Sequence, residues 1–240
     1  MAHDLYQNYT TTSTSFHGNT AFALDMYYNM YQMHISIHMP QTNRSEVKIL
    51  DIGCGWGGLL KVLQQEGYPQ AEGFDLSQEQ VDTALSLGVR NVTVNTIEDF
   101  FANAPDASYD VILLFDVLEH FPSEAGVTLM KHIQQALKPG GKVILQVPNG
   151  ASLISVNYYS DVTHYKAFTP TSLNQVAKMA GFSHTECTEA LPYLPFKKKL
   201  LSRFLWYIWI KPLSRAYMLA TVGNSAGKVY TPNIVSVWSK

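Results

Sequence analysis

The stretch VKILDIGCGWGG, residues 47–58, joins a short apolar run to a turn that is rich in glycine. Val47, Ile49 and Leu50 suit a strand that is buried on both faces of a sheet. Glycines allow the backbone to turn sharply and to approach a ligand closely. A leucine-rich helical pattern begins directly after them. This order of strand, glycine turn and helix predicts a ligand-binding turn in an α/β protein.

The charge of Asp51 indicates which ligand the turn holds. Gly53, Gly55 and Gly58 satisfy the GxGxxG spacing of dinucleotide-binding turns. A carboxylate just ahead of these glycines would repel the pyrophosphate of a nicotinamide cofactor. S-adenosylmethionine instead carries an ammonium and a sulfonium and no phosphate. We therefore expect S-adenosylmethionine, and binding of NADH is the alternative.

The sequence DIGCGWGG resembles motif I of the class I S-adenosylmethionine-dependent methyltransferases. The resemblance continues in order and spacing to Gly181, through DVLEHF at 116–121 and LKPGGKVILQVPN at 137–149. It implies an α/β, doubly wound, seven-stranded and mostly parallel sheet of the Rossmann-like methyltransferase fold. It also implies an N-terminal helical arm, a helical insertion before the last strand, and a cofactor at the carboxyl ends of the strands.

The expected cofactor site combines the glycine turn with the ends of the neighbouring strands. Asp75 ends a second strand, 71–75, about 20 residues beyond the turn, where an acid can accept both hydrogen bonds of a ribose diol. Ile97 and Glu98, rather than Thr96, are the residues expected at the adenine, although a helix-start acid explains Glu98 equally well. The predicted cofactor-binding residues are Asp51, Gly53, Cys54, Gly55, Gly57, Asp75, Leu76, Ile97, Glu98 and Phe115.

The motif DVLEHF follows a fourth apolar strand, 109–115, and supplies candidate catalytic groups. Asp116, Glu119 and His120 fall at i, i+3 and i+4, so one helical turn would place them on one face. In one interpretation His120 is a general base oriented by Asp116 or Glu119. In the other the three residues bind a divalent cation, as in the ubiquinone-type O-methyltransferases that this cluster resembles. An acidic helix start with a solvent-facing histidine is the non-catalytic alternative.

A polar and aromatic segment, NYYSDVTHYKAFTP at 157–170, follows the fifth strand. It resembles a segment of methyltransferases from bacterial surface-polysaccharide pathways, and sugars are bound by such mixtures of rings and hydrogen-bonding groups. His164 is therefore a rival general base. Thr169 and Pro170 also look like the start of a helix over 171–180, which explains part of the pattern. The predicted substrate-binding residues are Asn149, Tyr158, Tyr159, Asp161, His164 and Tyr165.

Length, charge and cysteine usage limit the classes of protein. A chain of 240 residues with 46% hydrophobic residues fits one domain. Its expected parts are an N-terminal arm with helices at 1–45, a Rossmann-like core at 46–190, a helical cap insertion at 191–227 and a last strand at 228–240. The formal net charge of -2 argues against nucleic acid as a partner. Two cysteines and no signal-peptide pattern predict a cytoplasmic protein without disulfides.

Two segments outside the core leave alternatives open. The polar arm before about residue 18 suggests a substrate lid. Within the following helical pattern, His34 and His38 have the spacing of metal ligands, but without a third ligand a structural pair is favoured. The basic and aromatic residues at 197–219 fit a cap over the substrate site or a homodimer contact, and alternatively a helix at the inner face of a membrane.

Taken together, these features predict an S-adenosylmethionine-dependent methyltransferase that O-methylates a sugar or sugar-phosphate group in surface glycan biosynthesis. One alternative is a quinone-like, metal-assisted O-methyltransferase, which would need a cation and an apolar acceptor pocket. Another is a non-catalytic, methyltransferase-like binding subunit.

Overall fold

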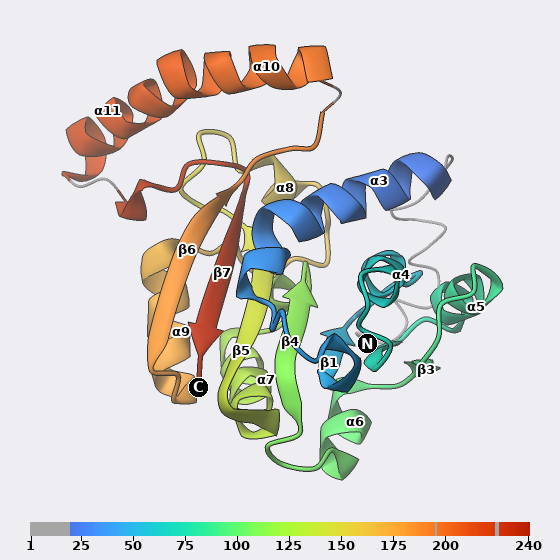
Figure 1. Cartoon of the computed structure of the whole chain (residues 1–240). Coiled ribbons are helices and arrows are strands. Elements are labelled where there is room, and N and C mark those ends of the chain that lie inside the picture. The colour runs from blue at the N-terminus through green and yellow to red at the C-terminus, as the bar shows by residue number, and fades with distance from the viewer. Residues whose placement is uncertain (1–19, 195, 224–225) are drawn as a thin grey trace.

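One seven-stranded sheet organises the chain (Figure 1). The structure is a computed structural model that describes residues 20–194, 196–223 and 226–240. The strand order is β3-β2-β1-β4-β5-β7-β6, and β7 runs antiparallel to both of its neighbours while the other pairs are parallel. The predicted seven-stranded, mostly parallel Rossmann-like sheet is confirmed. The arm before residue 20 lies outside the described residues.

Apolar strand sequences were the most predictable part of this sheet. The strands are β1 (Ile49–Ile52), β2 (Ala71–Asp75), β3 (Val92–Val94), β4 (Tyr109–Phe115), β5 (Leu137–Pro148), β6 (His184–Ala190) and β7 (Asn233–Ser239). β2 and β4 have the predicted bounds. β7 begins later than the expected residue 228, because the backbone carbonyls of Val229 and Thr231 accept hydrogen bonds from the side chain of Asn149 instead of pairing with a neighbouring strand.

Helices cover both faces of the sheet. The α-helices are α3 (Thr20–Met30), α4 (Gly58–Gln65), α5 (Gln78–Ser86), α6 (Ile97–Asn103), α7 (Ser123–Ala136), α8 (Val156–Tyr159), α9 (Pro170–Ala180), α10 (Phe196–Leu205) and α11 (Lys211–Val222). Shorter turns are η1 (Tyr31–Ile35), η2 (Ser36–His38), η3 (Arg44–Glu46), η4 (Leu118–His120), η5 (Trp206–Ile210) and η6 (Ala226–Lys228). Residues of η1, α4 and α5 belong to one core cluster, and residues of α7 and α9 to the other.

Side-chain caps begin α5 and α9, and the one at Thr169 has the predicted position. Thr169 caps α9 in a reciprocal capping box with Ser172, and Pro170 occupies the first turn. At α5 the Ser77 hydroxyl accepts a hydrogen bond from the backbone N–H of Gln80, at 3.4 Å. The cap at Ser77 lies two residues beyond the end of β2, so it helps to position the loop at the carboxyl end of that strand.

The helices α10 and α11, joined by η5, form an elongated arm that we call the basic helical segment, residues 196–222. It lies across the side of the molecule toward which β4 points, above α3 (Figure 1). The predicted helical insertion before the last strand is therefore present. Within the part of the chain that the structure describes, none of the helices has the length and apolar character needed to cross a membrane.

Candidate functional site

The glycine turn between β1 and α4 is closed by hydrogen bonds to the neighbouring strand. The backbone N–H groups of Gly53 and Cys54 both donate to the carbonyl of Phe74, at 2.9 and 3.1 Å. Gly53 has a φ of 68°, and a Cβ at this position would lie 2.7 Å from Cγ2 of Val117. Only glycine fits both the left-handed backbone and this close approach. The turn therefore has the shape that the sequence predicts.

Two acids lie at this turn. Asp51 is 3% exposed, and burial, assisted by the nearby charge of Asp75, raises its pKa to about 8. The carboxylate of Asp75 accepts hydrogen bonds from the backbone N–H groups of Gly55, at 2.9 Å, and Ser77, at 2.8 Å. Burial also raises the pKa of Asp75. A ligand with positive charge would offset the cost of holding these two carboxylates ionised so close together.

A cavity of about 490 Å³ opens beside the turn at the carboxyl ends of the central strands. Its floor includes five of the predicted site residues, which are Asp51, Gly53, Cys54, Phe115 and Asp116. The linker 190–193 and the start of β7 close another side. The cavity is therefore built by segments from nearly the whole described chain, and the glycine turn occupies only one part of it.

The wall contributed by α3 and η1 was not anticipated as part of the site. Met26, Tyr27, Met30, Met33 and His34 line the cavity from these elements. The tyrosine ring packs edge-on against Trp56, with centroids 5.4 Å apart. It also lies 2.5 Å from where a Cβ at Gly58 would be. The row of Met and Tyr residues at helical spacing was the available signal, but the sequence does not show which surface that helix covers.

His34 was expected to form a structural pair with His38, and the structure gives it a different setting. It lines the cavity, and burial, together with the charges of Arg203 and His38, lowers its pKa. Among the described residues, the one group of three potential metal ligands within reach of each other does not include either histidine. The lowered pKa favours the neutral form of His34 at the cavity wall.

The predicted adenine-binding residues do not line the cavity. Thr96 caps α6 by accepting a hydrogen bond from the backbone N–H of Asp99, at 3.0 Å. Ile97 packs against the core, and Glu98 is exposed. Gly55, Gly57 and Leu76 are also absent from the cavity lining, which leaves their role in cofactor binding a prediction.

The geometry expected for the DVLEH motif was wrong. Asp116 has a φ of 55°, in the left-handed region, and the helical turn that follows is a short 3₁₀ turn, η4. The three residues therefore do not share one face of an α-helical turn. Asp116 accepts two hydrogen bonds from the side-chain amide of Gln146, at 3.1 and 3.0 Å. Burial raises its pKa to about 6.

Glu119 is fully buried, which is unusual for a carboxylate. Within the described part of the chain, neither of its side-chain oxygens has a hydrogen-bond partner. The nearest cationic candidate is His164, whose Nε2 lies 3.9 Å from Oε1. Burial raises the pKa of Glu119 well above its usual range. A buried carboxyl group without partners is costly, so this position calls for a ligand.

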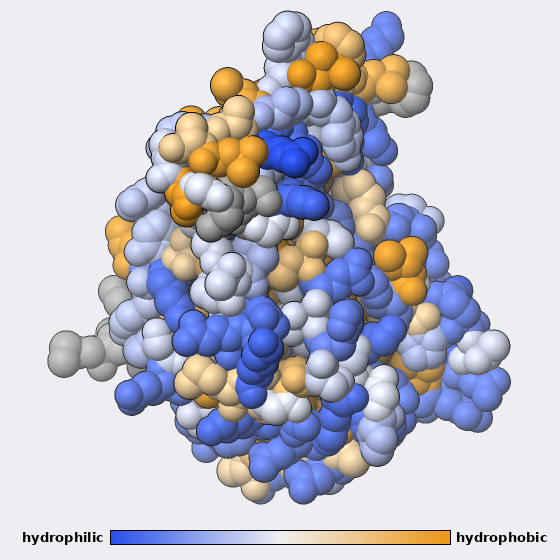
Figure 2. Space-filling model, turned by 90° about the vertical axis from the view of Figure 1, so that its left-hand side faces the viewer, coloured by the Kyte–Doolittle hydropathy of each residue, from blue (hydrophilic) through white to orange (hydrophobic). Residues whose placement is uncertain are grey.

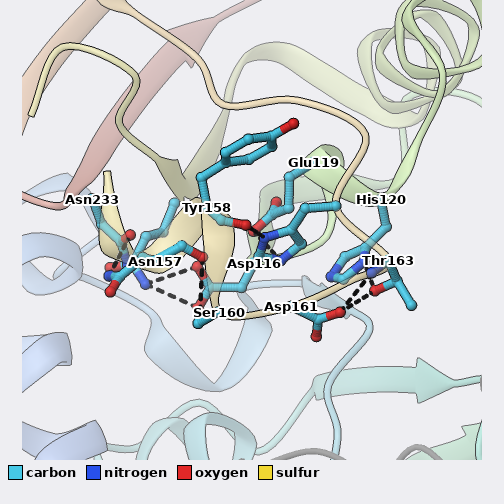
Figure 3. Close-up of polar contacts among 11 residues, drawn as sticks. Asp116, Glu119, His120, Asn157, Tyr158, Ser160, Asp161, Thr163 and Asn233 are labelled. Carbon is cyan, nitrogen blue, oxygen red and sulfur yellow. Dashed lines mark hydrogen bonds and ion pairs between the residues drawn. The ribbon is translucent and has the colours of Figure 1, made fainter. Parts of the chain in front are cut away.

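His120 and His164 lie beside Glu119, and further hydrogen bonds fix the orientation of each ring. Figure 3 shows the contact of His120 with Thr163. Thr163 donates its hydroxyl proton to Asp161 at 2.6 Å, so its oxygen accepts from Nδ1 of His120 at 2.8 Å. Nδ1 of His164 lies 2.9 Å from the backbone carbonyl of Tyr158 and donates to it. Burial lowers the pKa of His120 to about 4, which keeps this ring neutral.

These three side chains form the candidate metal-binding group. One ligand atom from each of Glu119, His120 and His164 lies within 4.8 Å of the others. The predicted cluster consisted of Asp116, Glu119 and His120. In the structure His164 takes the place of Asp116 in this group, and the carboxylate of Asp116 binds the side-chain amide of Gln146. Sequence spacing could not find His164, which comes from a distant loop. Asp116 lines the cavity, whereas the three clustered residues do not.

The predicted sugar-binding segment is mostly outside the cavity. Tyr159 and Tyr165 are exposed, and among residues 157–165 Asn157 alone lines the cavity, where its amide donates to Asn233 at 2.8 Å (Figure 3). Asn149 is fully buried, and its predicted role in binding substrate stays a prediction. Its side chain donates to the carbonyls of Val229 and Thr231, at 3.1 and 2.8 Å, and accepts from the N–H of Ala151.

The sheet order, the glycine turn with its two acids and the adjacent cavity define a class I S-adenosylmethionine-dependent methyltransferase fold. The chain belongs to the methyltransferase domain family, whose model matches residues 32–186. The match confirms the predicted methyltransferase class and, with it, S-adenosylmethionine as the expected methyl donor. It does not distinguish between acceptors.

Known proteins resemble the chain in sequence over part of its length and in fold over nearly all of it. Ubiquinone biosynthesis O-methyltransferases of Yersinia pestis and Yersinia pseudotuberculosis are 34% identical to it over 108 residues, 43% of this chain and 43% of theirs. The chain thus matches less than half the length of these curated relatives. Among solved structures, an S-adenosylmethionine-dependent methyltransferase from Archaeoglobus fulgidus superposes with a TM-score of 0.67 at 20% identity, covering 97% of this chain and 99% of that one. A phosphoethanolamine N-methyltransferase of Haemonchus contortus gives 0.65 at 20% identity, covering 100% and 60%. These structures share the fold.

Proposed function

We propose that the protein transfers the methyl group of S-adenosylmethionine to a hydroxyl of an apolar, phenol-like small molecule. The observation that carries this proposal is the cavity, which has carboxylates at its floor and an apolar wall opposite them. The carboxylates suit the cationic donor, and the apolar wall suits the acceptor.

The donor end of the cavity is the glycine turn. Asp51 lines the cavity directly and is buried, so its ionised form gains from a nearby ammonium or sulfonium. Asp75, held by the N–H groups of Gly55 and Ser77, keeps acceptor capacity for ribose hydroxyls. The methyl carbon on a sulfonium is already electrophilic, so the protein has mainly to align donor and acceptor.

The acceptor end favours an apolar molecule over a sugar. Met26, Met30, Met33 and Leu59 line the cavity with Tyr193, whereas the polar segment expected to hold a sugar lies mostly outside it. Methionine side chains adapt to flat or irregular apolar ligands. The name of the Yersinia relatives agrees with the quinone-type alternative, so we place a sugar or glycan acceptor second.

A divalent cation fits the group formed by Glu119, His120 and His164. The donor set is two imidazoles and one buried carboxylate that otherwise has no partner in the described chain, which suits Mn²⁺, Fe²⁺, Co²⁺ or Zn²⁺ better than Mg²⁺. The hydrogen bonds of both histidine Nδ1 atoms supply the outer support that ligating histidines require. When bound, such an ion would lower the pKa of an acceptor hydroxyl. Asp116 lines the cavity and also interacts electrostatically with Glu119, so it would orient that hydroxyl.

Turnover with a catechol that carries an apolar chain tests the acceptor, with a sugar nucleotide as the competing substrate. We expect methylation of the catechol, loss of activity on treatment with EDTA, and recovery with Mn²⁺ or Zn²⁺. Glu119→Gln should lose bound metal by elemental analysis, whereas the matched control Glu124→Gln, on the exposed first turn of α7, should keep it.

Three results would each contradict part of the proposal. Methylation of the sugar nucleotide alone would restore the sugar acceptor. Full activity of a metal-free protein would remove the cation. Binding of S-adenosylhomocysteine without turnover on either acceptor would point to a non-catalytic subunit.

A further inference from the structure

The basic helical segment, residues 196–222, turns several of its polar side chains toward the protein. Trp206 Nε1 and Lys211 Nζ both donate to Oε2 of Glu189, at 3.3 and 2.9 Å. Arg203 lies against the sulfur of Met33 at 3.6 Å, and Ser214 is almost fully buried. The face that contacts the body is therefore hydrophilic, which is the reverse of an ordinary surface helix.

The outward face of the same segment is apolar. Phe204, Trp209 and Leu213 are 57%, 65% and 65% exposed. Further exposed apolar residues on the segment are Leu200, Leu201, Tyr207, Ile208 and Tyr217. Hydrophobic residues gather at the top of the molecule in Figure 2, where the segment lies, interspersed with hydrophilic ones. Exposed apolar residues gathered in this way mark an interaction site.

The charge of the segment is strongly positive. It holds Lys197, Lys198, Lys199, Arg203, Lys211 and Arg215, and there is no Asp or Glu between residues 196 and 222. The whole chain, by contrast, has a formal net charge of -2. Lysine is depleted at protein interfaces, whereas lysine with tryptophan and tyrosine is typical of helices that lie at the surface of a bilayer.

We propose that the basic helical segment docks on an anionic lipid surface, with Phe204, Ile208 and Trp209 inserted among the lipids and the flanking lysines at the headgroups. A second copy of the chain fits the same face less well. A two-fold contact would bring two identical sets of cations together with no acid on the segment to offset them. A lipid surface supplies the negative charge as well as the apolar interior.

Docking in this orientation brings the cavity to the lipid. The linker 190–193 lines the cavity and leads directly into α10. An acceptor dissolved in the bilayer would reach the cavity past this linker, a step that rests on the proposed function. The docking itself does not depend on that function, and it can be tested without turnover.

Co-flotation of the full-length protein with vesicles tests the proposal. We expect binding to vesicles that contain phosphatidylglycerol and phosphatidylcholine, a shift of tryptophan emission to shorter wavelength, and no binding to phosphatidylcholine alone. Replacing Lys197 and Lys198 by Gln should weaken binding by about tenfold or more. The triple change Phe204→Gln, Ile208→Gln and Trp209→Gln should abolish it.

A matched control uses apolar residues that are equally exposed elsewhere. Leu85 on α5 and Met179 on α9 are 52% and 57% exposed, and changing both to Gln should leave vesicle binding intact. Circular dichroism would establish that all variants are folded. Failure of the wild-type protein to float would overturn the proposal, and so would binding that survives the triple change. A dimer in solution that the triple change dissociates would assign the face to a second copy instead.

Discussion

The buried carboxyl group of Asp51 makes cofactor affinity depend on pH. Its pKa is raised to about 8, so much of the group is protonated at neutral pH in the absence of a ligand. An ammonium or sulfonium favours the ionised form, and binding therefore releases a proton. Cofactor affinity should therefore rise with pH up to the pKa of Asp51 and level off above it.

The size of the effect follows from the fraction of Asp51 that is ionised. With a pKa of about 8, that fraction is about one half at pH 8 and about one hundredth at pH 6. Apparent affinity is proportional to the fraction of molecules that are competent to bind. It should therefore fall by about 50-fold from pH 8 to pH 6, which corresponds to about 2.3 kcal/mol of binding free energy.

Calorimetry with S-adenosylhomocysteine, which retains the ammonium, measures this linkage directly. In buffers of different ionisation enthalpy, binding at pH 6.5 should release close to one proton. In the Asp51→Asn variant the side chain cannot ionise, so cofactor affinity should change little between pH 6 and pH 8. The variant should bind the cofactor more weakly than the wild type mainly at the higher pH. Equal wild-type affinity at pH 6 and pH 8 would contradict this linkage. A variant with Asn at position 51 that kept the full pH dependence of affinity would contradict it as well.

Other substitutions test separate parts of the site. Asp75→Ala should weaken cofactor binding by about 1–3 kcal/mol, because ribose hydroxyls lose their acceptor; unchanged affinity in calorimetry would refute this assignment. Gly53→Ala should reduce the free energy of unfolding by about 1–3 kcal/mol more than Gly140→Ala. Both glycines have positive φ, but of the two only Gly53 is crowded, by Val117. Equal urea midpoints for the two variants would contradict this prediction. Asn149→Ala should lower the melting temperature through about 1–3 kcal/mol of lost stability while leaving substrate KM unchanged, because its partners are buried carbonyls; a raised KM at normal stability would restore a substrate role.

Local sequence patterns account for much of the fold. The bounds of β2, the apolar run of β4 and the cap at Thr169 are determined by neighbouring residues, and the structure confirms them. The site depends more on contacts between distant segments. Asn149 looks like an active-site residue at the end of β5, yet its partners are about 80 residues away in sequence and hold it in the interior.

Long-range packing likewise explains the differences at the cavity. Tyr27 is part of the site because its helix lies over Gly58, and no local pattern specifies that contact. His164 joins Glu119 because the loop after α8 folds back on η4, where the backbone N–H of Tyr165 donates to the carbonyl of Glu119 at 2.8 Å. The left-handed conformation of Asp116 breaks the helical spacing from which the cluster was predicted.

The position of β7 in the sheet has a consequence for how the chain folds during synthesis. β7 lies between β5 and β6, so β6 has no partner in the sheet until residues 233–239 have left the ribosome. The basic helical segment precedes β7 and is therefore synthesised while the sheet is still incomplete. Until β7 joins the sheet, the facing edges of β5 and β6 are unpaired, and unpaired strand edges leave this stage of biogenesis open to aggregation or to capture by a chaperone.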